Sequence, residues 1–166
     1  LKEFFSMVII DTFNKEGLGE KLDDIKDEIR TKENYLDSDF ESNGEKRFFL
    51  IAFDLVQRKI IGSIEFGPAS NLIIECTNHH FKELLEVGTV FVHPDYQRNG
   101  IGNLLLNKMY TTLQNKGVDE FCLDSGYMNA QRIWRKKFGE PDYWLKDYWG
   151  KGYDHMIWKI RVSDWV

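Results

Sequence analysis

Residues 90–106 read VFVHPDYQRNGIGNLLL. The apolar run at the start predicts a strand that ends at Pro94. A polar turn follows, and Gly100 and Gly102 open a leucine-rich helix. The first amides of a helix have no partner inside it, so a phosphate group can bind against them. Because Gly100 and Gly102 lack a Cβ, a bulky anion can approach the backbone closely.

This order of strand, turn and glycine-opened helix resembles the cofactor signature of the GNAT acetyltransferases, which transfer an acetyl group from acetyl-coenzyme A to an amine. The family pattern is Gln or Arg, two variable residues, Gly, one variable residue, and Gly or Ala. Gln97, Gly100 and Gly102 fit it. The resemblance extends more weakly over residues 48–160 and implies acetyl-coenzyme A as the co-substrate. The alternative is an ordinary turn between a strand and a helix, in which the glycines serve only geometry.

The resemblance also implies which residues bind the cofactor. The amides of residues 98–103 are placed to bind the pyrophosphate of coenzyme A, and the side chain of Arg98 is a candidate for a charge-assisted contact. In the family, the preceding strand separates from its neighbour, binds the pantetheine arm and polarises the thioester carbonyl through a backbone N–H. The expected set is Val90, Phe91, Val92, Gln97, Arg98, Asn99, Gly100, Ile101, Gly102 and Asn103. The strand residues alone are equally compatible with a buried strand of no special role, and Arg98 with a solvated surface arginine.

Glu86 is the candidate general base. A base is needed because an alkyl ammonium has a pKa near 10.4, so only about one amine in two thousand is neutral at pH 7. Family members keep a glutamate on the strand that the sequence predicts for residues 84–93. The distance from Glu86 to Pro94 differs by one residue from a common family spacing, so its side chain takes the other face unless Gly88 forms a bulge. The alternative is an exposed strand acid.

Tyr127 is a candidate general acid for the leaving thiolate. The family pattern on the next helix is Asn-x-x-Ala-x-x-Leu-Tyr followed by Gly, and Ala130 and Ile133 fit it. Trp134 occupies the position of the tyrosine, and an indole cannot donate a proton near neutral pH. The missing tyrosine acid could be replaced by Tyr127, which occupies the asparagine position of the family pattern, by Tyr143 or by water. The thiolate could also leave without a proton donor.

On the same predicted helix, Asn129 is a candidate contact to the cofactor, with an exposed helix surface as the alternative. The Cys76-x-x-His79-His80 sequence has no second Cys/His pair, and a tetrahedral metal site needs four ligands, so we expect no metal. Cys76 and Cys122 show no disulfide framework and indicate a reduced, cytoplasmic protein.

Composition excludes several function classes. The 166 residues suit a single domain over residues 1–166, and the net charge of −5 argues against a nucleic-acid partner. No apolar run approaches the roughly 18 residues that span a bilayer, so no membrane partner is expected. Aromatic residues gather near the C-terminus, where they could form core, line a pocket for a cationic amine or support a homodimer.

Hydrophobic periodicity predicts the order of elements. Helices are expected from residue 1 until Gly17 and Gly19, and over 20–35, 100–116 and 128–138. Strands are expected over 47–53, 59–66, 84–93, 118–124 and 155–162. Residues 37–44 are polar and turn-prone and are expected to form a linker. The secondary structure of residues 71–81 is ambiguous, and residues 72–74 could form a short strand inside a longer irregular segment.

The expected fold is therefore a mixed α/β (α+β) single GNAT-like domain with a central, mostly antiparallel, twisted sheet flanked by helices. By resemblance, the strands at the cofactor site are splayed and the strand that begins the family fold is missing. The expected function is transfer of acetyl from acetyl-coenzyme A to a primary amine of a small molecule or peptide, by direct attack in a ternary complex. The alternative is a non-catalytic coenzyme A-binding sensor or regulatory module.

Overall fold

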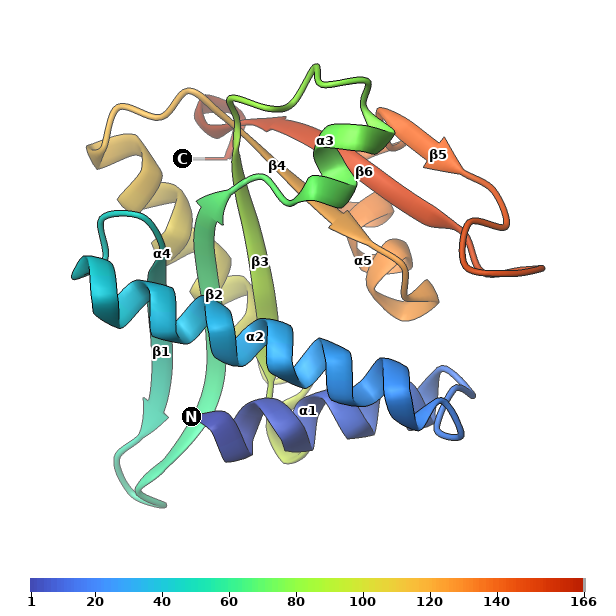
Figure 1. Ribbon diagram of the computed structural model, residues 1–166. Coiled ribbons are helices and arrows are strands. Elements are labelled where there is room, and N and C mark those ends of the chain that lie inside the picture. Colours follow the sequence, from blue (N-terminus) through green and yellow to red (C-terminus); the bar gives the residue numbers. More distant parts are fainter. Residues whose placement is uncertain (166) are drawn as a thin grey trace. The chain divides into compact units, whose positions relative to one another are not determined.

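The computed structural model describes residues 1–165 (Figure 1). Its strands follow the hydrogen-bonded order β1-β2-β3-β4-β6-β5 in a six-stranded sheet. The chain divides into two compact units. The first unit comprises residues 1–66 and 89–112, and the second comprises residues 67–88 with the chain from Leu113 onward. Because β2 (Lys59–Pro68), β3 (Leu85–Val92) and α4 (Ile101–Asn115) each cross a boundary, both units contain part of them.

The first unit begins with two helices that lie side by side, α1 (Lys2–Lys15) and α2 (Leu22–Ser42) (Figure 1). They are followed by the antiparallel strands β1 (Phe48–Asp54) and β2 (Lys59–Pro68). Phe5 is fully buried, with its ring 5.8 Å from that of Phe49 and 5.9 Å from that of Phe91. This aromatic core holds α1 against β1 and against the strand that leads to the glycine turn.

The second helix is longer than the sequence predicts. The expected helix over residues 20–35 and the expected linker over 37–44 are replaced by a helix that continues to Ser42. Leu36 is buried, and its burial extends the helix through polar residues of low helix propensity. Asn43, with φ of 51°, then ends the helix in the left-handed conformation.

The second unit contains α3 (Asn71–Cys76), the start of β3, β4 (Glu120–Ser125) and α5 (Met128–Phe138). The short strand β5 (Tyr143–Leu145), β6 (His155–Arg161) and the 3-10 turn η2 (Val162–Asp164) complete it. β4 and β6 pair antiparallel along their whole length, from Glu120↔Arg161 to Ser125↔Met156. The fully buried residues Phe121, Cys122 and Ile157 lie on this pair.

In the second unit, the structure resolves one segment that the sequence leaves ambiguous and adds one strand that the sequence does not predict. Residues 71–76 form a helix, and no strand forms at residues 72–74 in the described chain. The helix forms because Ser70 is its N-cap, with Oγ accepting a hydrogen bond from the amide of Ile73, and because Ile73 is fully buried. The strand β5 was not predicted, since three residues are too few to show an alternating pattern.

The parallel pairing between β3 and β4 is short. Its partners are Leu85↔Phe121 and Glu86↔Cys122, although β4 continues to Ser125. The other β4 edge is fully paired with β6. The mixed α/β class, with a six-stranded, mostly antiparallel sheet and helices around it, is confirmed.

Candidate active site

The turn between β3 and α4 is anchored by its own side chains and by neighbours in the first unit. The hydroxyl of Tyr96 in the 3-10 turn η1 (Pro94–Tyr96) donates to Oδ2 of Asp54 over 2.6 Å. This hydrogen bond lowers the pKa of the Asp54 carboxyl. Gln97 folds back so that Nε2 donates to the carbonyl of Val92, while Oε1 accepts from Nζ of Lys15. Gln97 therefore holds the turn in place.

The glycine positions open the turn to an approaching group. Residues 97–100 are exposed, and Arg98 and Gly100 both have positive φ, 64° and 83°. A Cβ built on Gly100 would meet nothing within 4 Å, and one built on Gly102 would meet only a methyl group of Val92 at 3.8 Å. The turn surface at these two glycines is free of contacts that would block a ligand.

The helix start supplies donors beside this open surface. The hydrogen bond from the amide of Leu104 to the carbonyl of Gly100, 3.0 Å long, is the first of the i→i+4 type in α4. In a helix that starts this way, the amides of Ile101, Gly102 and Asn103 point out of its N-terminal end. Such an end favours an anion through its amides and its dipole. The predicted residues Asn99 and Asn103 are exposed at this turn, so the residues present fit a diphosphate.

The predicted strand residues Val90, Phe91 and Val92 are half-buried at the end of β3. Gly62 lets β2 approach them, since its Cβ would lie 3.3 Å from the carbonyl of Phe91 and 2.9 Å from the side chain of Leu105. Thr89, directly before them, has a φ of 49°. The sequence analysis considered a bulge at Gly88, whereas the positive φ occurs one residue later, at Thr89.

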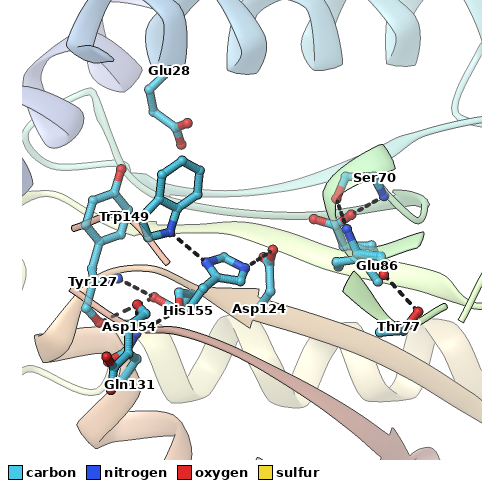
Figure 2. Close-up of polar contacts among 12 residues, drawn as sticks. Glu28, Ser70, Thr77, Glu86, Asp124, Tyr127, Gln131, Trp149, Asp154 and His155 are labelled. Carbon is cyan, nitrogen blue, oxygen red and sulfur yellow. Dashed lines mark hydrogen bonds and ion pairs between the residues drawn. The ribbon is translucent and has the colours of Figure 1, made fainter. Parts of the chain in front are cut away.

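Glu86 is buried on β3, opposite Cys122 of β4. Its Oε2 accepts a hydrogen bond of 2.7 Å from the amide of Ser70, the residue that caps α3, as Figure 2 shows. The carboxylate therefore anchors the start of α3. Burial chiefly raises the pKa of the neighbouring Cys122 thiol, and the charges of Glu86 and Asp124 raise it further.

The residues considered for the acid step lie at the start of α5. Tyr127 is the N-cap residue, and its amide donates to Oγ of Ser125 over 3.0 Å. Asn129 is exposed in the first turn. Trp134 is buried and stacks on Phe138 with ring centroids 5.7 Å apart. The residue at the family's tyrosine position therefore belongs to the core of this unit.

A buried histidine that the sequence analysis did not single out lies between a carboxylate and an indole. Nε2 of His155 is 2.9 Å from Oδ2 of Asp124, and Nδ1 accepts a hydrogen bond of 3.1 Å from Nε1 of Trp149 (Figure 2). Because an indole N–H only donates, Nδ1 is unprotonated and Nε2 carries the proton toward Asp124. A neutral imidazole oriented by a carboxylate can accept a proton at Nδ1 once the indole moves away.

No local signal could have identified this pair. Asp124 and His155 are 31 residues apart and meet only through the register of β4 and β6. Tyr143, the other candidate acid, contacts Nδ1 of His80 through its hydroxyl over 2.9 Å.

Two further features concern metals and membranes. Within residues 1–165, no group of three or more His, Cys, Asp or Glu side chains is arranged to hold a metal ion. None of the described helices has the length and apolar character of a membrane span.

Comparison with known proteins agrees with this geometry. The Acetyltransferase (GNAT) family matches residues 9–139, and the chain therefore belongs to the GNAT acetyltransferase family. No curated protein matches the sequence.

Solved structures share the fold. A protein of Desulfovibrio desulfuricans assigned to the GNAT family is 16% identical, with 82% of each chain covered and a TM-score of 0.66. An aminoglycoside 6′-acetyltransferase type Ii is 16% identical over 98% of this chain and 90% of that one, with a TM-score of 0.63. The PaiA N-acetyltransferase of Thermoplasma acidophilum, in complex with coenzyme A, is 19% identical over 96% and 89%, with a TM-score of 0.61. At these identities the likeness concerns the fold.

Proposed function

We propose that this protein is an N-acetyltransferase that uses acetyl-coenzyme A and a primary amine, with direct attack of the amine in a ternary complex. The observation that carries the proposal is the open turn at Gly100, which leads into the N-terminal end of α4. Family membership and the complex of the PaiA enzyme with coenzyme A support it.

The binding roles follow from the donors of the turn. The amides of Ile101, Gly102 and Asn103 would bind the diphosphate, and Arg98 would add a charge-assisted contact. The backbone of Val90 to Val92 would orient the pantetheine arm. When bound, acetyl-coenzyme A supplies an activated thioester carbonyl.

Proton removal from the acceptor is assigned to one of two groups. Glu86 is a carboxylate already held by the amide of Ser70. His155 becomes a base only if the indole of Trp149 leaves Nδ1, and Asp124 then stabilises the imidazolium. Tyr127 is the proposed proton donor to the thiolate, because buried Trp134 cannot serve.

The acceptor is proposed to be a cationic amine of a small molecule or a peptide. Aminoglycoside acetyltransferases among the fold relatives motivate the first class, and a ribosomal-protein-alanine N-acetyltransferase motivates the second. We also propose a cytoplasmic location, which the free thiols of Cys76 and Cys122 support.

A non-catalytic coenzyme A sensor is the second candidate, favoured by the buried Trp134 in place of the expected tyrosine. One experiment separates the two. Purified protein is titrated with coenzyme A in a calorimeter and then incubated with acetyl-coenzyme A and a panel of polyamines, aminoglycosides and peptides with free amino termini, while free thiol is recorded. Binding with acceptor-dependent thiol release supports the enzyme, binding without release supports the sensor, and absence of binding contradicts both.

A further inference from the structure

Thr89 adopts a backbone conformation that its side chain disfavours. Its φ of 49° lies in the left-handed region, which β-branched residues rarely enter. The residue is 4% exposed and lies within β3, directly before Val90, Phe91 and Val92, the last three residues of the strand. A buried, unfavourable conformation persists only where the surroundings impose it, so the contacts of Thr89 are informative.

Two side chains of β2 hold Thr89, one at its hydroxyl and one at its carbonyl. Its hydroxyl donates to Oε1 of Glu65 over 3.1 Å, and its carbonyl accepts from Oγ of Ser63 over 3.0 Å. Ser63 and Glu65 are fully buried and, two residues apart on a strand, lie on the same face of β2. The left-handed turn is therefore tied down by a pair built into the neighbouring strand.

The buried carboxylate of Glu65 is paired with the guanidinium of Arg47. Arg47 donates to Oε2 of Glu65 over 2.6 Å and lies with its guanidinium 3.6 Å from the ring centroid of Tyr35 on α2. Burial raises the pKa of the Glu65 carboxyl, while the charges of Arg47 and Lys32 and the hydrogen bonds from Arg47 and Thr89 oppose this. Replacing such a buried ion pair by apolar residues is often neutral or stabilising, so its presence here calls for a role beyond stability.

We propose that the buried Arg47–Glu65 pair is a positioning element that fixes the left-handed turn at Thr89 and thereby aims the amides of Val90, Phe91 and Val92. A left-handed residue in a strand locally disrupts the alternation of its peptide groups, so the conformation of Thr89 sets the direction of the peptide groups that follow it. The inference rests on the proposed function, because the ligand of those amides is taken to be the pantetheine arm of coenzyme A.

Substitutions at Thr89 separate this role from plain stabilisation. Thr89→Gly removes the hydroxyl but also removes the steric conflict at positive φ, so the variant folds without the strain. We expect it to keep the wild-type melting temperature while its dissociation constant for coenzyme A rises about tenfold, the factor that one hydrogen bond to a charged group contributes. Thr89→Ser retains the hydroxyl and should bind within about twofold of wild type, since its contact with Glu65 is preserved.

The measurements are calorimetric binding of coenzyme A and, without any ligand, hydrogen–deuterium exchange of the peptide that covers residues 89–93. Faster exchange in Thr89→Gly than in Thr89→Ser is expected. Thr77→Val is the matched control, because Thr77 is also a buried threonine, and its hydroxyl donates to a backbone carbonyl of α3. It should lower the melting temperature and leave coenzyme A binding unchanged.

The outcomes are distinct. Wild-type affinity in Thr89→Gly, or an equal loss in Thr77→Val or in Thr89→Ser, overturns the positioning role while the proposed function stands. A wild-type protein that fails to bind coenzyme A overturns the proposed function, and the positioning role with it.

Discussion

Buried His155 and half-buried Asp124 form a hydrogen-bonded pair in which Nε2 lies 2.9 Å from Oδ2, and the indole of Trp149 donates a hydrogen bond to the other ring nitrogen, Nδ1. The arrangement fixes a single tautomer of a side chain that is 4% exposed. A carboxylate that orients an imidazole can contribute to the stability of the fold and to proton transfer. The free energy of unfolding measures the first contribution, and kcat measures the second.

Asp124→Asn should destabilise the fold by about 1–3 kcal/mol, because the buried imidazole loses its charged acceptor. Urea denaturation followed by fluorescence measures this change in the free energy of unfolding. Asp142→Asn is the control, since Asp142 also accepts a hydrogen bond from β6, at the amide of Lys159, but is exposed. Equal losses in both variants would argue against a special role for the His155 pair.

Gly100→Ala should abolish or strongly weaken coenzyme A binding. At a φ of 83° an alanine costs about 1–2 kcal/mol, and its methyl group enters the open surface that the diphosphate would use. Gly117→Ala provides a matched control at a φ of 72°, also with nothing within 4 Å of the added Cβ. Both variants should lose similar stability in thermal unfolding, while only Gly100→Ala loses affinity. Similar affinities for coenzyme A in the two variants would count against the turn as the cofactor site.

Glu86→Gln tests the general base with little disturbance of α3. The amide oxygen of glutamine can still accept the hydrogen bond from Ser70, so the melting temperature should change little. If the carboxylate takes the proton of the amine, kcat should fall by about 10²–10⁴-fold. Thiol release with an acceptor from the amine panel measures kcat. An unchanged kcat would transfer the role to His155 or to water, and His155→Gln then becomes the decisive variant.

Asp154 should make the stability of the β5–β6 hairpin depend on pH. A hydrogen bond from the amide of Asp147 and one from the indole of Trp144 hold the pKa of Asp154 below its ordinary 3.8. Because the folded pKa is the lower one, the stabilisation is present above pH 3.8 and is lost as the pH falls through the folded value. Wild type should therefore exceed Asp154→Asn in melting temperature near neutral pH, and the gap should narrow toward about pH 2. The control is Asp23→Asn, at a side chain 98% exposed, and an equal narrowing there would contradict the prediction.

The two thiols should differ in reactivity. Burial raises the pKa of the Cys122 thiol, and Cys122 has no exposed surface, whereas Cys76 is half-buried. Iodoacetamide at mildly alkaline pH should modify Cys76 in the folded protein and Cys122 only after denaturation. Mass spectrometry of native Cys76→Ser should show no alkylation, and rapid modification would contradict the burial of Cys122.

Much of the fold was predictable because its signals are local. The helix α5 has the predicted bounds of residues 128–138, and α4 begins at Ile101, directly after the glycine turn. The extension of α2 to Ser42 was not predictable, since it depends on burial of Leu36, and neither was the helix over residues 71–76, where an apolar run suits helix or strand.

The candidate site divides in the same way. The family, the strand–turn–helix order and the glycines of the cofactor turn could be inferred from the sequence, because a few neighbouring residues carry these features. The contact of Thr89 with Glu65 and that of His155 with Asp124 became visible only in the folded chain. The partners in each contact are 24 and 31 residues apart, and the pairing depends on strand register and burial, which no short stretch of chain encodes.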